Sequence, residues 1–464
     1  MDRRVKGWEN GWREFGKVLI PLTNRFPEVI ALMRHLVGMV STNHSGSPTL
    51  DPDNVSASDC KYGNSSASLN RSSEKSLLFV PLFSRAYCLG SCLKVAEELH
   101  RQSPKLSILI LEPRGGVNSL PPYIEIISMS ALRKKGFVKL PGAAISGVML
   151  WKAICRALTK EKILCDEMTR VFGNWKRHLL KWCCLYHYDE KIARQLLVRR
   201  RVESVVTIND IVKPAAPIIS AGNKLGIQTV VLQHGTPGPQ SAPFIAREGW
   251  VWGETSKRAI EVFGADPSRL RVMGSLESEG VPSTEVSVRK SGEARTLVFL
   301  GQWRATRGWG EPFFQEVFDL LCEVIRLNGG HWKLRIRLHP TDPAEAAIDI
   351  ASRLKDLGAD STLSSPETTM EEELASANAL LSISSSGLMN GVSAGIPTAQ
   401  ILPEDLERKI GPALLSATNL LRDQAEFENW LQLIEAGDPS LLESNEQVLA
   451  NRGEVARLMA RNLI

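Results

Sequence analysis

Residues 229–237 read TVVLQHGTP, a β-branched apolar run that ends abruptly in a histidine, a glycine and a proline. Such a run is typical of a buried strand of a parallel sheet, because these strands are covered on both faces. The polar residues follow directly, where a parallel sheet has its carboxyl edge and where ligands bind in open α/β folds. We therefore interpret His234 as a side chain that the fold delivers to a site, in a turn shaped by Gly235, Thr236 and Pro237.

Two more apolar runs end in polar residues in the same way. Residues 334–338 (LRIRL) run into His339 and Pro340, and residues 379–383 (ALLSI) run into a cluster of serines. This serine cluster and its glycine are Ser384, Ser385, Ser386 and Gly387. Backbone N–H groups at a strand-to-helix turn bind phosphate, and hydroxyl groups add further donors. We therefore predict a phosphate site made of His339 and the serine cluster.

The chain of 464 residues is longer than one hydrophobic core usually organises, so two domains are expected. Strand-like and helix-like segments alternate through both halves, which indicates parallel sheets covered by helices. We predict an α/β fold of two Rossmann-like domains that face a cleft, with an N-terminal extension. The extension and its flexible Ser- and Asn-rich linker span 1–75, the first domain 76–280 and the second domain 290–464.

Composition indicates a globular protein, with 43% hydrophobic and 23% charged residues. No apolar stretch reaches the length of a spanning helix, and the first thirty residues carry charges throughout, so neither a membrane span nor a secretory signal is expected. The eight cysteines lack paired CxxC spacing, which favours reduced core thiols. We expect a cytoplasmic protein, with peripheral membrane contact as an option.

One segment carries most of the positive charge. Residues 131–201 hold 17 Lys and Arg against five Asp and Glu, although the net charge of the whole chain is only +5. Trp151, Trp175 and Trp182 are interleaved with these charges in helix-like runs. The pattern fits core-packing helices with a solvated basic face, or a surface that contacts anionic lipid headgroups or an anionic polymer. No nucleic-acid recognition motif accompanies it, so we expect no nucleic-acid partner.

Two residues compete for the role of general base. His234 has a side chain that titrates near neutral pH, and Asp210 ends the strand-like run at 202–210. Each candidate has a structural alternative. His234 could be a hydrogen-bonded turn residue and His339 a structural strand-end histidine, while the serines could cap a helix. The residues alone leave the choice between His234 and Asp210 open.

Together, the three junctions resemble the motifs of a group of enzymes. QHGTP at 233–237, RLHP at 337–340 and SSS at 384–386 stand in the order found in bacterial capsule and teichoic-acid polymerising transferases. These include CDP-glycerol glycerophosphotransferases and polysialyltransferase-like enzymes, which share the GT-B architecture of two Rossmann-like domains. The similarity covers about residues 202–402. This chain departs from the pattern at Gln233, where glycerophosphotransferases usually have tryptophan, and it lacks the acidic motif that serves as base in sialyltransferases.

The resemblance implies an inverting glycosyltransferase or glycerophosphotransferase of capsule or cell-envelope polysaccharide biosynthesis that needs no metal or other cofactor. It implies a role for His234 in catalysis and for His339 and the serine cluster at the donor phosphate, with Gly301 and Gln302 as a further candidate donor loop. The partners would be a nucleotide-activated donor, cytidine in those families, and a glycan or lipid-linked acceptor. The alternatives are an enzyme similar to nucleotide-sugar 2-epimerases and a non-catalytic polysaccharide-assembly protein that retains the fold.

Overall fold

The computed structural model describes most of the two predicted domains. It describes residue 29 and residues 74–464, except for 83, 85, 114, 118, 136–139, 161–168, 170–173, 236, 238–240, 280–293, 302–310, 329, 339–347, 349, 353, 356–360, 366, 384, 404–418, 444–447 and 452. The predicted N-terminal extension thus lies outside the described residues, apart from Val29, Glu74 and Lys75. Val29 is fully buried and belongs to the core of the first domain.

The first domain is built on a seven-stranded parallel sheet with the order β3-β2-β1-β4-β5-β6-β7. Its strands are β1 (Ser76–Val80), β2 (Ser107–Leu111), β3 (Ile124–Ile127), β4 (Val202–Thr207), β5 (Gln228–Leu232), β6 (Glu248–Val251) and β7 (Leu270–Val272). The central strands are rich in Val, Ile and Leu and are mostly buried, as expected of parallel strands between layers of helices. The strand order reverses between β1 and β4, and such a reversal opens a crevice at the carboxyl ends of the strands.

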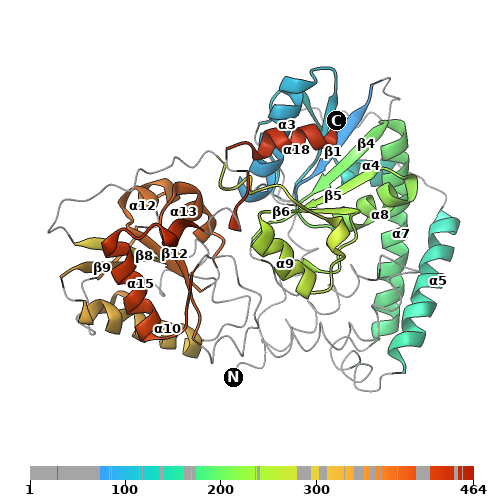
Figure 1. Cartoon of the computed structure of the whole chain (residues 1–464). Helices are drawn as coiled ribbons and strands as arrows, with labels where there is room; N and C mark the ends of the chain where they lie inside the picture. Colours follow the sequence, from blue (N-terminus) through green and yellow to red (C-terminus); the bar gives the residue numbers. More distant parts are fainter. Residues whose placement is uncertain are drawn as a thin grey trace.

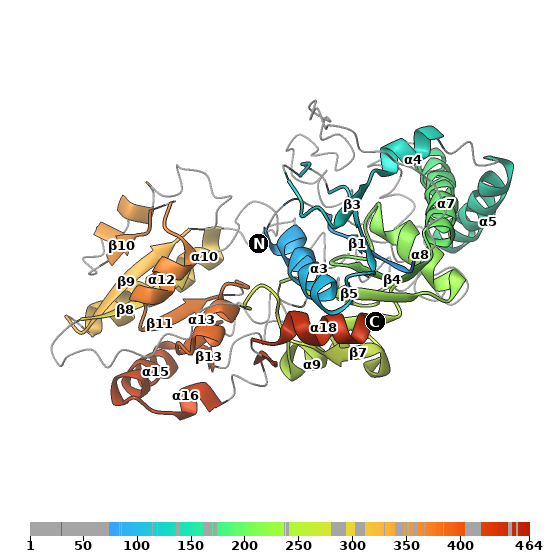
Figure 2. The ribbon, with the colours of Figure 1, turned by 90° about the horizontal axis from the view of Figure 1, so that it is seen from above.

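Helices pack beside this sheet in two groups (Figures 1 and 2). The elements are η2 (Ala86–Gly90), α3 (Ser91–Gln102), α4 (Met129–Lys135), α5 (Leu140–Leu158), α7 (Trp175–Arg199), α8 (Ala215–Leu225), α9 (Glu254–Val262) and η4 (Pro267–Arg269). On one side α7 packs on α8, and α5 packs on α7 as the outermost helix. Helix α8 ends at Leu225, because Gly226 adopts the left-handed conformation that stops a helix (φ +77°).

The second domain repeats this plan with a six-stranded parallel sheet of order β10-β9-β8-β11-β12-β13. Its strands are β8 (Arg295–Leu300), β9 (Trp332–Arg337), β10 (Ser361–Leu363), β11 (Ala379–Ser382), β12 (Thr398–Ile401) and β13 (Asn419–Leu421). Its helices are α10 (Glu311–Leu327), α12 (Met370–Ser376), α13 (Leu388–Ala394), α15 (Gln424–Ala436) and α16 (Ser440–Glu443). The order reverses between β8 and β11. The predicted α/β fold with two Rossmann-like domains is therefore confirmed.

The last helix returns to the first domain. Helix α18 (Val455–Leu463) packs against α3, and both views show the two side by side (Figures 1 and 2). Val455, Met459 and Leu463 are buried in the first domain's core. Helix α18 lies within the predicted range of 290–464, yet its apolar face has its partner on α3 of the first domain.

The two domains are in contact beyond the carboxyl edge of the first sheet. Trp252 directly follows β6 of the first sheet, yet it is buried in a cluster of the second domain that includes Leu388 and Met389 of α13. The Ser393 hydroxyl of α13 donates to the Ser278 carbonyl, which lies beyond β7 (2.9 Å). Polar residues that follow strands of either sheet therefore stand near the same domain boundary.

Strand β3 is the element of the first sheet that sequence reasoning missed. Its four residues (IEII) are too few for a clear periodicity, and a glutamate interrupts the apolar run. It lies at the sheet edge beside β2, where one flank has no neighbouring strand in the sheet. The prediction of helices in the basic segment that follows is confirmed by α4, α5 and α7.

Candidate functional site

The first candidate side chain stands at the carboxyl end of β5. His234 follows this strand by two residues and is exposed to solvent. Gly235 has φ +77°, a left-handed conformation that glycine adopts without strain, so the chain turns sharply there. Of the other predicted turn residues, Pro237 is buried and Thr236 lies outside the described residues. The imidazole therefore stands at the sheet edge, where a ligand has access.

Gln233 fixes the turn that carries His234. Its side-chain nitrogen donates to the Gly235 carbonyl (3.1 Å) and to the Ser256 hydroxyl (3.0 Å). Its side-chain oxygen accepts from the Trp252 backbone N–H (2.9 Å). One side chain thus ties the turn to the residue after β6 and to α9. Sequence reasoning registered Gln233 only as a departure from a tryptophan, and the structure gives it a positioning role.

Asp210 lies beyond β4, the neighbour of β5, but its carboxylate is turned inward. It is 3% exposed, and its Oδ2 accepts hydrogen bonds from the backbone N–H groups of Ile245 (2.5 Å) and Ala246 (2.6 Å). Burial raises the pKa of Asp210 from 3.8 to about 6, although these N–H groups and Arg269 act in the opposite direction. Arg269 in turn donates to carbonyls of the same loop, Phe244 at 3.1 Å among them. Asp210 and Arg269 thus hold the loop that leads into β6 from two sides.

In the second domain, the serine cluster begins at the carboxyl end of β11, at the reversal of the strand order. The Ser382 hydroxyl donates to the Leu300 carbonyl (2.8 Å) and accepts from the Ser385 N–H (3.1 Å). The Ser385 hydroxyl accepts from the Gly387 N–H (3.2 Å). Two N–H groups of the turn are thus occupied by serine oxygens, which makes Ser385 a turn-shaping residue. Ser386 and Gly387 are half-buried.

Gly301 follows β8, the strand that pairs with β11 beside this turn. It is buried directly after β8, and its N–H donates to the Arg337 carbonyl at the end of β9 (2.7 Å). The register pairs Ser382 of β11 with Leu300 of β8, so the serine turn and Gly301 follow adjacent strand ends. Helix α13 beyond the turn has only seven residues and supplies a small dipole. Phosphate binding here would depend on hydroxyl and amide donors of the turn.

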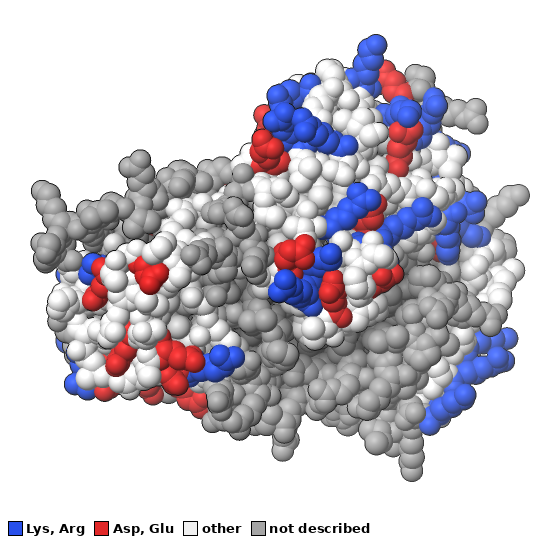
Figure 3. Space-filling model, viewed as in Figure 1, with Lys and Arg blue, Asp and Glu red and all other residues white. Residues whose placement is uncertain are grey.

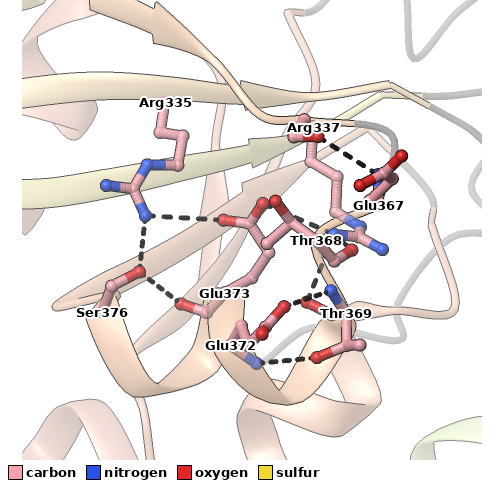
Figure 4. A network of polar contacts seen from close by, with 9 residues as sticks. Arg335, Arg337, Glu367, Thr368, Thr369, Glu372, Glu373 and Ser376 are labelled. Carbon is pink, nitrogen blue, oxygen red and sulfur yellow. Dashed lines mark hydrogen bonds and ion pairs between the residues drawn. The ribbon is translucent and has the colours of Figure 1, made fainter.

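The arginines of β9 are held by a buried carboxylate (Figure 4). Glu373 of α12 is fully buried and lies 3.7 Å from Arg335 Nη1 and 3.4 Å from Arg337 Nη1. Arg335 also donates to the Ser376 hydroxyl (2.6 Å), and Arg337 donates to the Thr368 carbonyl (2.6 Å). Both arginines of β9 are therefore engaged in ion pairs inside the protein.

One carboxylate near the first sheet's edge was not singled out from the sequence. Glu277 borders a small cavity beyond β7, and Gln233 forms part of the same wall. Burial raises the pKa of Glu277 to about 7, while Lys94 acts to lower it. Lys94 is itself anchored on the carbonyls of Leu276 (2.6 Å) and Glu279 (2.8 Å). Local sequence could not mark this residue, because α3 and α18 complete the cavity.

The other predicted site residues, Gln302, His339 and Ser384, lie outside the described residues, as Thr236 does. Their roles stay predictions. Among the residues that the structure does describe, no three His, Cys, Asp or Glu side chains form a group able to hold a metal ion. None of the described helices has the length and apolar character that a membrane crossing requires.

Comparison with known proteins yields likeness in fold. No family model matches the chain, and no curated protein matches its sequence. Among solved structures, the lipopolysaccharide outer core galactosyltransferase WaaB is similar with TM-score 0.48 and 14% identity, over 83% of this chain and 98% of that one. The UDP-GlcNAc 2-epimerase of Neisseria meningitidis bound to UDP-GlcNAc gives TM-score 0.49 and 12% identity, over 84% and 99%. The wall teichoic acid polymerase TagF gives 0.42 and 10%, over 84% and 87%. At such low identity and TM-score, no reaction is inferred from these likenesses.

Proposed function

We propose that this chain is an inverting, metal-independent transferase of GT-B type. It would move a glycosyl or glycerophosphate group from a nucleotide-activated donor to a glycan or lipid-linked acceptor in surface polysaccharide biosynthesis. One observation carries the proposal. Each of the two parallel sheets has a polar turn at or beside the reversal of its strand order, where ligands of such folds bind, and Trp252 after β6 of the first sheet is buried in a cluster of the second domain.

The second domain would hold the donor. Its serine turn and Gly301 follow adjacent strands at the reversal point, and Ser386 and Gly387 are half-buried at the turn. We assign the donor phosphates to this turn, together with His339 and Ser384, and the nucleotide to the loop at Gly301 and Gln302. The motif resemblance favours a cytidine nucleotide.

The first domain would present the acceptor to His234. A general base must come within hydrogen-bond reach of the proton that it removes. His234 is exposed at the sheet edge, whereas the Asp210 carboxylate is buried and already accepts two backbone N–H groups. We therefore favour His234 as the base and assign Asp210 to holding the loop before β6.

In the proposed step, the acceptor hydroxyl oxygen attacks the donor carbon or phosphorus while the bond to the departing nucleotide phosphate breaks. The proton of the hydroxyl passes to the imidazole of His234, and the leaving phosphate takes the electron pair of the broken bond. Donors fixed before the reaction stabilise the developing charge at little cost in reorganisation. The serine hydroxyls of the second domain, and the backbone N–H groups of the turn that serine oxygens do not occupy, would act in this way.

Ligand binding and turnover test the proposal together. Thermal unfolding with CMP, CDP, UDP and GDP should show a rise in melting temperature for one base, because a ligand that binds only the folded state stabilises it. His234→Asn should keep this rise and lower transfer to an acceptor by about 10²–10⁴-fold. His331→Asn is the matched control, because His331 stands at the opposite, amino end of a strand.

Three outcomes would count against the proposal. Donor interconversion without any acceptor would indicate an epimerase. Full transfer activity in His234→Asn would remove the proposed base. Absence of a shift with every nucleotide would favour a non-catalytic assembly protein.

A further inference from the structure

Helices α5 and α7 form an antiparallel hairpin on the outer side of the first domain. A Cβ added to Gly147 of α5 would lie 2.7 Å from Cys184 Cα of α7, so the two backbones are in close contact there. Nearer the end of the hairpin, the Trp151 indole N–H donates to the Lys176 carbonyl (2.9 Å). In both views the hairpin lies at the side of the molecule away from the second domain (Figures 1 and 2).

The outward face of this hairpin is cationic. Exposed basic side chains stand at one end of the hairpin on both helices, and they are Lys152, Arg156, Lys160, Lys176, Arg177 and Lys181. Within the described residues, none of the six forms an ion pair with a carboxylate. Basic side chains gather at the lower right of Figure 3, the edge at which Figure 1 places α5.

The acidic residues within the two helices themselves do not weaken this charge. Helix α5 contains no Asp or Glu. The two acidic residues of α7, Asp189 and Glu190, are buried and paired, Asp189 with Arg133 (2.7 Å) and Glu190 with Lys224 (2.5 Å). The exposed face of the two helices thus has one sign of charge.

Large apolar side chains are exposed on the same hairpin. Ile145 is 62% exposed and Met149 is 55% exposed. With Lys152 and Arg156 they follow the spacing of a single face of α5. Leu185 of α7 is 44% exposed, and it lies at the level of Ile145 and Met149 because its neighbour Cys184 touches Gly147. A helix that carries cationic and apolar groups on its outer face suits the boundary between headgroups and acyl chains.

We propose that the α5–α7 hairpin docks on an anionic lipid surface, with its basic side chains at the headgroups and Ile145, Met149 and Leu185 at the acyl boundary. Charge complementarity selects this occupant, because anionic headgroups match the face of α5 and α7, whose described residues include no exposed Asp or Glu. Docking would leave the second domain accessible to a soluble donor. It would also place the first domain, which carries His234, next to lipid-linked molecules. The proposal stands independently of the proposed reaction.

Two contacts connect helix α7 of the hairpin to the first domain near the candidate site. The Tyr186 hydroxyl of α7 donates to the Ala216 carbonyl in the first turn of α8 (3.0 Å). The Lys213 ammonium lies over the Trp182 ring, 5.1 Å from its centroid. Both contacts join α7 to the segment that follows Asp210. The surface that would meet the membrane is therefore rigidly connected to the carboxyl edge of the first sheet.

Vesicle flotation with the full chain tests the proposal. We expect binding to vesicles of 30% phosphatidylserine and 70% phosphatidylcholine at 50 mM NaCl, little binding at 500 mM NaCl, and none to pure phosphatidylcholine. Removing one basic side chain at the surface weakens partitioning about fivefold, so Lys152→Gln with Arg156→Gln should weaken it about 25-fold. Lys105→Gln with Arg461→Gln is the matched control, since it removes the same charge from exposed positions elsewhere. The control should bind like the wild type.

The apolar contribution needs its own variant. Ile145→Ser with Met149→Ser should weaken partitioning more than tenfold, because the transfer of large apolar side chains from water to an acyl environment is favourable. Both residues are exposed, so circular dichroism should show an unchanged fold. Equal binding to neutral and anionic vesicles would overturn the proposal, as would wild-type binding by the Lys152 and Arg156 variant. If the wild type forms a dimer and the Lys152 and Arg156 variant is a monomer, the face contacts a second copy of the chain instead of a membrane.

Discussion

Replacing Asp210 by asparagine separates the two candidate bases and gives a pH signature that follows from burial. Asparagine keeps an oxygen that can accept from the N–H groups of Ile245 and Ala246, and it removes the charge. In the wild type the pKa rises from 3.8 to about 6 on folding, because burial disfavours the ionised carboxylate. The folded state thus binds the proton more tightly than the unfolded state.

The sign and size of the effect follow from linkage. A carboxylate with a raised folded pKa contributes stability that is fully present below pH 3.8 and lost as the pH rises through about 6. A rise of this size corresponds to about 3 kcal/mol in total, of which about 2 kcal/mol falls between pH 4.5 and pH 7.5. Over this interval the unfolding free energy of the wild type should therefore fall by about 2 kcal/mol relative to that of Asp210→Asn.

Urea unfolding followed by circular dichroism at the two pH values measures this difference in unfolding free energy. The contributions of the other titrating groups are the same in both proteins and cancel. Transfer activity at pH 7.5 is the second readout, and we expect the variant to keep most of it, since asparagine can still hold the loop before β6. If the difference in unfolding free energy between the wild type and Asp210→Asn does not change with pH, the burial argument is refuted. A folded variant with activity reduced 10²–10⁴-fold would make Asp210 the base instead of His234.

Two further variants test contacts on either side of the domain boundary. Gln233→Leu removes three hydrogen bonds and leaves the Trp252 N–H without its acceptor, so we expect a loss of about 2–4 kcal/mol in urea unfolding. The displaced turn should lower turnover about 10²-fold while the pH profile set by His234 keeps its shape, and a shifted profile would contradict a positioning role. Glu373→Gln leaves Arg335 and Arg337 without their buried counter-charge and should destabilise the second domain by about 2–3 kcal/mol. An unchanged unfolding free energy would show that solvent already screens these two ion pairs.

Local sequence predicted much of the fold, because its signals act over a few residues. Apolar runs ending in Gly, Pro or polar residues marked β4, β5, β9 and β11. Glycine marked the end of α8, since a left-handed residue closes a helix wherever it occurs. Strand β3 escaped notice because four residues carry too little pattern. The return of α18 to α3 was not predictable in this way, because the two helices are more than 350 positions apart.

The sequence by itself determined which side chains stand at strand ends, and so where a ligand site was to be sought. Only the tertiary structure decided which of them remain accessible. Asp210 and His234 follow adjacent strands, but the loop at 245–246 covers the first and leaves the second exposed. Arg335 and Arg337 of β9 are both paired with Glu373, which comes from α12. Burial and pairing depend on groups distant along the chain, and a side chain that is already satisfied inside the protein has less to offer a substrate.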